Sequence, residues 1–216
     1  MGVLLLVRHG QASFGSTDYD RLSPLGRRQA DLLARRLAAG PDRIRGLVSG
    51  RLDRQRGTAV AIGAAAGVPT TVDGRWDEYD HVGITGGRSA DLVFDPGGTP
   101  DARDRASATL DEALRRWIGG EPAGPETHPQ FVQRCSAALR SVTASPGITV
   151  VSTSGGVIAV VAAMLLGLPI DRWPSLARVT VNCGFTKVIA GRRGLSVVSF
   201  NDHAHLEHDR ALITYR

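Results

Sequence analysis

The stretch Val3-Leu4-Leu5-Leu6-Val7-Arg8-His9-Gly10 stands near the start of the chain and decides how the rest is interpreted. Its five apolar residues follow one another without alternation, which is typical of a parallel strand covered on both faces. In open α/β sheets, ligands bind beyond the carboxyl ends of such strands. We therefore expect His9 to lie at a binding site.

The chemistry of this site is indicated by Arg8. A histidine at the end of a strand can act as a general base, a metal ligand or a nucleophile. The guanidinium of Arg8 offers a rigid fork of donors suited to phosphate, and a neighbouring cation disfavours a metal ligand. Arg8 and His9 together predict phosphate chemistry.

Length and composition favour an α/β domain of ordinary size. The chain has 216 residues, 42% of them hydrophobic, which suffices for a sizeable core. No basic leader precedes the first strand, and the most apolar later segment, residues 157–168, is too short to cross a bilayer. We expect a cytoplasmic protein without a membrane partner.

The basic charge does not point to nucleic acid. The net charge of +5 is spread along the chain, and no basic stretch is interleaved with aromatic residues that could stack on bases. A positive field is compatible with anionic substrates such as phosphate esters. Cys135 and Cys183 lack metal-ligand spacing and are expected to be buried thiols.

Helix and strand patterns alternate along the chain. Ser23 can cap a helix that begins at Pro24 and stops before Gly40-Pro41. Further helices are expected at residues 54–66, 101–117, 128–142 and 155–166. Further strands are expected at residues 44–49, 70–72, 148–152, 179–181, 185–190 and 195–200, the last two as a hairpin.

Residues 82–127 are rich in glycine, proline and charge, and we interpret them as an insertion or lid over the site. The whole chain, residues 1–216, then forms a single domain. We predict a three-layer α/β/α architecture around a mostly parallel central sheet.

Four strand ends carry polar residues that this architecture would bring to one edge. They are Arg8-His9-Gly10, residues 49–54, residues 76–81 and residues 153–156. In this order they resemble the motifs of the histidine phosphatase family, which has the phosphoglycerate-mutase-like fold. The first motif of that family is Arg-His-Gly, and Gln11 stands where many members have glutamate.

The second and third motifs of the family also have counterparts. Its second motif has a leucine, an arginine two residues on and Thr-Ala after three more, which Leu52, Arg54 and Thr58-Ala59 match. Its acid after the third strand corresponds to Glu78, which we prefer to Asp77 and Asp80.

The fourth motif departs from the family pattern. Most members have a histidine directly before Gly-Gly, whereas this chain has Ser154 before Gly155-Gly156. A subgroup of similar sequences combines Arg-His-Gly-Gln-Ala, Glu-Tyr-Asp-His and Ser-Gly-Gly. This chain resembles that subgroup, because it has all three stretches. His205 lies in a segment similar to the C-terminal part of the family, where it could orient a group in the pocket.

The resemblance implies a metal-independent phosphomonoester hydrolase with a phosphohistidine intermediate on His9. Arg8 and Arg54 would hold the phosphoryl group, and Glu78 would protonate the leaving oxygen and then activate water. Further contacts to the substrate would come from Gln11, Ser154, the backbone of Gly155 and His205. No metal ion or other cofactor is expected.

Two alternatives remain open. A cofactor-dependent phosphoglycerate mutase would have to shield its phosphohistidine from water, and Ser154 is compatible with a weakly active phospho-ligand-binding protein. The expected partner is a small phosphorylated metabolite, and a homodimer is left open. His81, His128, His203 and His208 are interpreted as surface or loop histidines.

Overall fold

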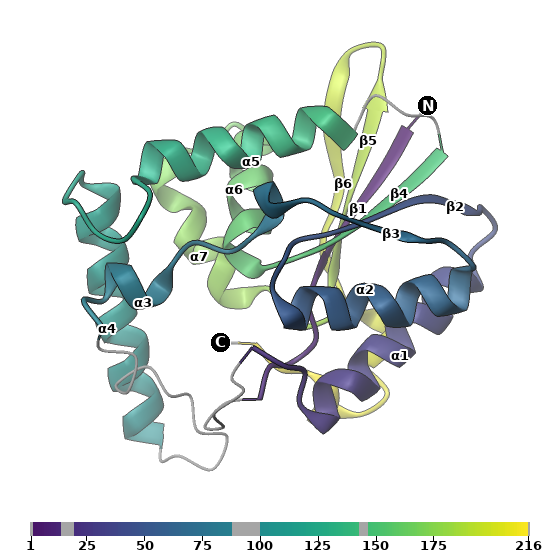
Figure 1. The fold of residues 1–216 in the computed structure, drawn as a ribbon, viewed down its shortest axis with the longest axis horizontal. Coiled ribbons are helices and arrows are strands. Elements are labelled where there is room, and N and C mark those ends of the chain that lie inside the picture. The colour runs from purple at the N-terminus through teal and green to yellow at the C-terminus, as the bar shows by residue number, and fades with distance from the viewer. Residues whose placement is uncertain (1, 14–19, 88–99, 143–146, 216) are drawn as a thin grey trace.

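The strand predicted at the start of the chain lies inside a six-stranded sheet in the computed structural model (Figure 1). The structure describes residues 2–13, 20–87, 100–142 and 147–215. The strand order is β3-β2-β4-β1-β5-β6. The strands are β1 Gly2–Arg8, β2 Ile44–Ser49, β3 Thr70–Val72, β4 Gly147–Thr153, β5 Phe185–Gly191 and β6 Gly194–Asp202.

The first four strands run parallel. β1 pairs with β4, β4 with β2, and β2 with β3 in parallel register, whereas the hairpin of β5 and β6 joins β1 through an antiparallel pairing. The carboxyl ends of β1 to β4 therefore share one edge, where Arg8 stands opposite Thr153 and Ser49 opposite Ser152. The predicted mostly parallel sheet is confirmed.

Helices cover both faces of the sheet. Figure 1 shows α1 and α2 on one face and α5 and α6 on the other. Along β1, Leu5 and Val7 belong to the core on the α1 side, whereas Leu4 and Leu6 belong to the core on the α6 side. This alternation explains the continuous apolar run and confirms three layers. The helices are α1 Pro24–Ala38, α2 Asp53–Ala66, α3 His81–Ile84, α4 Pro100–Ile118, α5 His128–Val142, α6 Gly155–Leu166 and α7 Trp173–Val179.

The insertion contributes to the core through α4. Leu110, Leu114 and Trp117 are buried in the same apolar cluster as Phe131 of α5. Residues 88–99 lie outside the described part of the chain, and the lid role of the insertion stays a prediction.

The strand predicted at residues 179–181 is wrong. Val179 ends helix α7, whose first residues Trp173 and Pro174 are buried. Proline at the start of a helix is compatible with helical geometry, and the apolar spacing of Trp173 and Ala177 matches one helical turn. This packing outweighs the strand preference of the valine.

The interpretation of His128 as a surface histidine is also wrong. Its side chain is buried, and its Nε2 lies 3.1 Å from the indole Nε1 of Trp173, which donates a hydrogen bond to it. Burial lowers the pKa of His128. Cys135 and Cys183 are free, buried thiols, as the sequence predicted.

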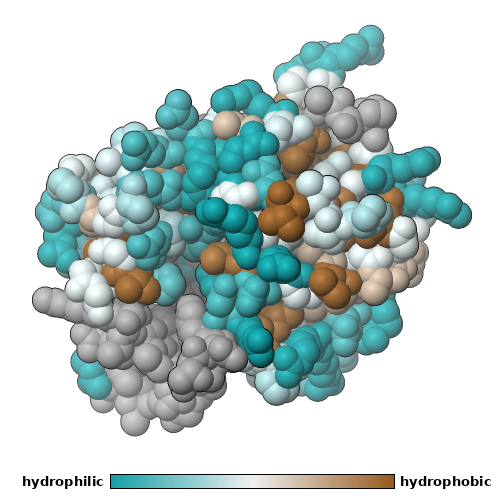
Figure 2. Space-filling model, viewed as in Figure 1, coloured by the Kyte–Doolittle hydropathy of each residue, from teal (hydrophilic) through white to brown (hydrophobic). Residues whose placement is uncertain are grey.

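The molecular surface in this view is mostly hydrophilic, with apolar patches over the half of the molecule that contains β2, β3 and α2 (Figure 2). Val60 of α2 and Val72 of β3 are among the exposed apolar side chains. Within the described residues, no helix is both long and apolar enough to span a membrane. The strongly apolar α6 is instead covered by protein, since its residues 155–163 are buried.

Candidate active site

His9 lies where β1 and β4 end side by side. Its backbone N–H donates to the carbonyl of Thr153 at 2.9 Å, and its own carbonyl accepts from the Asn182 amide at 2.9 Å. The side chain is 6% exposed. Two backbone hydrogen bonds therefore fix the histidine at the edge of the sheet.

The hydrogen bonds of the imidazole define its tautomer. Nδ1 lies 2.7 Å from the carbonyl oxygen of Gly10, and Nε2 lies 3.1 Å from Nε of Arg54. A guanidinium can only donate, so Nε2 must accept, and Nδ1 must carry the hydrogen given to Gly10. Nε2 thus holds a lone pair, as a nucleophile requires.

The surroundings of His9 keep the ring neutral. Burial is the largest cause, followed by the charges of Arg54 and Arg8, and together they lower the pKa of His9 well below its usual range. The hydrogen bond to Gly10 opposes this shift. Since only the neutral ring can attack, the same cations that would bind an anion also keep the nucleophile available.

Arg54 is positioned by the first turn of α2 and by a partner outside it. One of its terminal nitrogens, Nη1, pairs with the carboxylate of Asp20, which also accepts from the backbone N–H of Asp53 at 2.7 Å. Its guanidinium is thereby held with Nε toward His9. Asp20 is a supporting residue that the sequence analysis missed.

The spacing from Arg54 to Thr58 has a direct structural reason. The Thr58 hydroxyl donates to the Arg54 carbonyl at 2.9 Å and accepts from the backbone N–H of Gly10 at 3.0 Å. A Cβ on Gly10 would lie 2.4 Å from the carbonyl oxygen of Gly26 in α1, so only glycine fits there. These contacts lock the loop after β1 against both helices.

Arg8 flanks the start of α6. Its Nη1 donates to the carbonyl of Thr180, and a Cβ built on Gly155 would lie 3.6 Å from its Nε. The two arginines therefore come from different elements, Arg54 from α2 and Arg8 from the end of β1, with the Arg8 guanidinium beside the start of α6. Such an arrangement suits several oxygens of one anion.

Ser154 precedes α6 and is 1% exposed. Its hydroxyl oxygen accepts a hydrogen bond of 2.8 Å from the side-chain amide of Gln55, which leaves the hydroxyl hydrogen to be donated. The helix that begins at Gly155 has 12 residues, so its first amides and its dipole favour an anion at this end. Gln55 is another residue that sequence reasoning missed.

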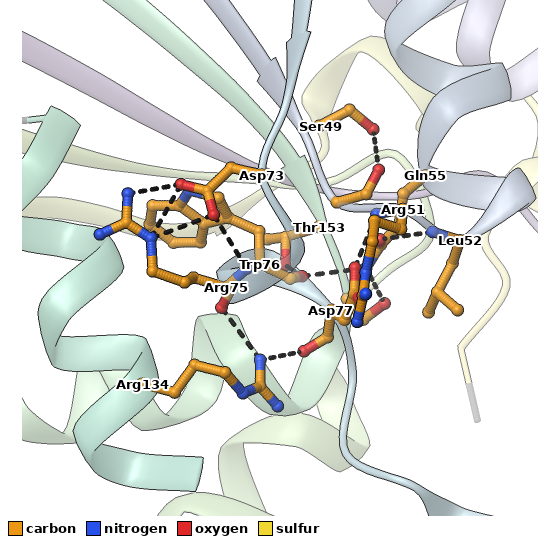
Figure 3. Close-up of polar contacts among 12 residues, drawn as sticks. Ser49, Arg51, Leu52, Gln55, Asp73, Arg75, Trp76, Asp77, Arg134 and Thr153 are labelled. Atoms are coloured by element: carbon orange, nitrogen blue, oxygen red, sulfur yellow. Dashed lines mark hydrogen bonds and ion pairs between the residues drawn. The ribbon is translucent and has the colours of Figure 1, made fainter. Parts of the chain in front are cut away.

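Glu78 contacts the start of α6, the same helix end that Ser154 precedes. Its Oε2 accepts from the backbone N–H of Gly156 at 3.0 Å, and a Cβ on Gly156 would lie 2.4 Å from Oε1. The other two acids serve elsewhere. Asp77 accepts from the Nε of Arg51 at 2.7 Å (Figure 3), and Asp80 caps α3 by accepting from the backbone N–H of Gly83. Among the three carboxylates considered from the sequence, Glu78 is the one at the start of α6.

Two residues predicted to contact the substrate have other partners in the structure, and their contact with substrate stays a prediction. The Gln11 side-chain oxygen accepts from the Ser23 hydroxyl at 2.8 Å, and Ser23 in turn caps α1. The ring of His205 stacks on Phe185, with centroids 6.2 Å apart, on the side of the sheet that α1 covers. Burial lowers the pKa of His205 to about 4. The structure places these side chains as supports for packing.

The described residues contain no cluster of three or more His, Cys, Asp or Glu side chains arranged to hold a metal ion. What the site offers is a neutral imidazole, two guanidinium groups, a buried hydroxyl, a carboxylate and the start of a helix. The combination can bind a dianion next to a nitrogen lone pair.

Comparisons with known proteins point to the same chemistry. The profile of the Histidine phosphatase superfamily (branch 1) matches residues 4–203. A glucosyl-3-phosphoglycerate phosphatase of Mycolicibacterium vanbaalenii is 34% identical over 189 residues, which are 80% of this chain and 78% of that protein. The range matched by the family profile includes Arg8, His9 and Gly10.

Solved structures extend the similarity to the fold. The native structure of a mycobacterial glucosyl-3-phosphoglycerate phosphatase gives a TM-score of 0.68 at 27% identity, covering 94% of this chain and 99% of that one. A complex of such a mycobacterial phosphatase with inorganic phosphate gives a TM-score of 0.64 at 25% identity, covering 94% of this chain and 98% of that one. The predicted fold class is confirmed.

Proposed function

The chain belongs to the histidine phosphatase superfamily (branch 1), and we propose that it is a phosphomonoester hydrolase whose nucleophile is Nε2 of His9. The observation that carries the proposal is the fixed tautomer of this ring. The bond from Nδ1 to Gly10 and the bond from Arg54 to Nε2 both require the lone pair on Nε2.

The first step forms the phosphohistidine. On binding, the guanidiniums of Arg8 and Arg54 take the phosphoryl oxygens, and the lone pair of Nε2 attacks phosphorus in line with the leaving oxygen. The N–P bond forms as the P–O bond breaks, and the protonated carboxyl of Glu78 gives its hydrogen to the leaving alcohol. The Gly10 carbonyl stabilises the positive ring through Nδ1–H.

The second step releases phosphate. The Glu78 carboxylate accepts a proton from water as the water oxygen attacks phosphorus and the N–P bond breaks. His9 returns to its neutral form and Glu78 to its protonated form, so both are ready for a new substrate. Ser154 and the backbone N–H of Gly155 stabilise the charge on the phosphoryl oxygens throughout.

We also propose that catalysis needs no metal ion. The positive charge that transition-state stabilisation requires is supplied by Arg8, Arg54 and the start of α6. Turnover should therefore be unchanged by a chelator. A loss of turnover that added divalent cations restore would contradict this part of the proposal.

The substrate is proposed to be a small phosphorylated metabolite. Because the relatives named above are glucosyl-3-phosphoglycerate phosphatases, this ester is the first compound to test, followed by a panel of sugar and acid phosphates. Phosphate release without isomerisation supports a hydrolase, whereas conversion of monophosphoglycerates in the presence of 2,3-bisphosphoglycerate would support a mutase.

The two free thiols support a cytoplasmic location.

The nucleophile is tested by trapping the intermediate. The enzyme is mixed with a phosphorus-labelled substrate, quenched in base, which preserves phosphohistidine, and mapped by mass spectrometry. We expect the label on His9 and none in His9→Ala. Stable label on another residue, or full activity in His9→Ala, refutes the proposal.

A further inference from the structure

Arg134 of α5 reaches across to the segment that carries Glu78. Its Nη1 donates to the carbonyl of Arg75 at 2.9 Å and to the carbonyl of Asp77 at 2.8 Å (Figure 3). The second carbonyl belongs to the residue directly before Glu78. One guanidinium nitrogen thus joins two backbone positions that lie on either side of Trp76.

The opposite edge of the guanidinium is held by Glu126. Nε of Arg134 lies 3.0 Å from Oε2 of this carboxylate, and Nη2 lies 2.5 Å from Oε1. The guanidinium carbon also lies 5.1 Å from the ring centroid of Phe131. Both side chains of the ion pair are only about one-fifth exposed, at 20% and 21%, so the two-point contact is partly shielded from water.

The segment is fixed from its other side as well. The carbonyl of Trp76 accepts from the Thr153 hydroxyl at 2.6 Å and from the Gln55 amide at 3.1 Å. Figure 3 shows these contacts on one side of the segment and Arg134 on the other. Since β4 and α2 hold one side of the segment, Arg134 of α5 supplies the opposing hold.

The charge of Arg134 also interacts with that of Glu78. Burial lowers the pKa of Arg134, but the hydrogen bonds and charge of Glu126, together with the charge of Glu78, raise it above its usual range. The guanidinium therefore carries its charge while it holds the two carbonyls.

We propose that Arg134 is a positioning residue for Glu78: held by Glu126, it fixes the carbonyls of Arg75 and Asp77 so that the Glu78 carboxyl stays between Gly156 and the leaving oxygen. The inference rests on the proposed role of Glu78 as proton donor. Glu126 further links this hold to the insertion, because its carbonyl accepts from the indole Nε1 of Trp117 at 3.0 Å.

The test uses the leaving group as the readout. Alkyl phosphates need a proton donor, whereas p-nitrophenyl phosphate needs little protonation of its leaving group. We expect Arg134→Met, which keeps an apolar side chain over Phe131, to lower kcat on an alkyl phosphate roughly tenfold or more beyond its effect on p-nitrophenyl phosphate. This is a part of the roughly 10²–10⁴-fold that a general acid contributes.

Two further variants sharpen the test. Arg134→Lys keeps the charge but loses the fork, so it should show the same selectivity. Arg140→Met on the same helix is the matched control, because Arg140 is exposed and bonds Ser136, and it should leave both rates unchanged. If Arg134→Met does not fold, Glu126→Gln weakens the same hold and should show the selectivity in smaller degree.

The outcomes separate the inference from the proposed function. One outcome overturns the positioning role alone. In it, Glu78→Gln loses kcat selectively on the alkyl phosphate, whereas the Arg134 and Glu126 variants lose kcat equally on both substrates. No selectivity in Glu78→Gln overturns the acid assignment, and the positioning role with it. The inference is supported if Glu78→Gln and Arg134→Met each lose kcat selectively on the alkyl phosphate, and if combining the two substitutions causes no further loss.

Discussion

Replacing Arg54 by alanine should lower turnover while the protein stays folded. The substitution removes Nε of Arg54, which lies 3.1 Å from Nε2 of His9 and would donate a hydrogen bond to a phosphoryl oxygen when substrate is bound. Losing one donor that stabilises developing charge costs about 10²–10³ in kcat, or about 2.7–4 kcal/mol. Arg8 and the start of α6 remain, so measurable turnover should persist. Arg54→Lys should recover only part of the loss, since the planar fork is gone.

The same substitution should shift the pH profile. The charge of Arg54 is one cause of the lowered pKa of His9, second to burial. Without it the pKa rises towards its usual value, and a protonated ring cannot attack. The acid limb of kcat/KM should therefore move to higher pH in Arg54→Ala and stay near the wild-type position in Arg54→Lys.

The assay is kcat and kcat/KM between pH 4.5 and 8 for wild type, Arg54→Ala and Arg54→Lys, with circular dichroism as the control for folding. Arg54 is buried, but its partner Asp20 has a side chain that is 37% exposed and can be rehydrated, so we expect a stability loss of about 1–2 kcal/mol. Wild-type kcat in Arg54→Ala would remove Arg54 from the site. An unmoved acid limb would show that His9 is not the titrating nucleophile.

Three other predictions concern Ser154 and His205. Ser154→Ala should lower kcat roughly tenfold, because it removes one hydrogen-bond donor to the phosphoryl group; an unchanged kcat would contradict this. Ser154→His should lower kcat, because the position is only 1% exposed and the Gln55 amide lies 2.8 Å from the serine hydroxyl, which leaves no room for the ring. A rise in kcat would show that there is room. Because the pKa of His205 is about 4 in the folded protein against an ordinary 6.5, the unfolded chain binds the proton more tightly, so the free energy of unfolding should fall from pH 7 to 4. Urea unfolding of His205→Asn should show a shallower fall, and an unchanged pH dependence would contradict the burial of a neutral ring.

The fold could be predicted from the sequence because its strands are strongly patterned. The apolar run of β1 is buried on both faces, and the helix that Ser23 caps begins at Pro24 as expected. The strand expected at residues 179–181 failed because a valine in a short segment has no intrinsic preference strong enough to resist packing. Short segments depend on their tertiary neighbours, which the sequence does not show.

The site could be predicted only where a residue type is tied to a motif. Arg8, His9 and Arg54 meet because the motif spacing reflects the ends of neighbouring elements. Gln11, which stands where many family members have glutamate, and His205, in a less specific match, were predicted as substrate contacts, yet one supports α1 and the other packs on Phe185. A motif fixes the backbone position, whereas the direction of a polar side chain depends on which donors and acceptors lie nearby.

Gln55 and Arg134 contact the site, yet no sequence pattern predicted either residue. Gln55 follows Arg54 directly, and its amide donates both to Ser154 and to the carbonyl of Trp76, a residue 21 positions away. Arg134 reaches carbonyls more than 50 positions away. Such partners are brought together only by the sheet and the helix layer, so no local pattern could identify them.

The pairing of Ser154 with Gln55 has a consequence for the rate. The resemblance to the family predicts a histidine at this point, and here a neutral hydroxyl backed by a neutral amide stands in its place. The cations beside the nucleophile are then Arg8 and Arg54, and a neutral donor stabilises a phosphoryl dianion less than a charged one. Inorganic phosphate carries the same charge as the group being transferred, so it too is held less tightly. We therefore expect the serine to slow the chemical step and to speed product release, so that overall turnover falls by less than the rate of the chemical step does.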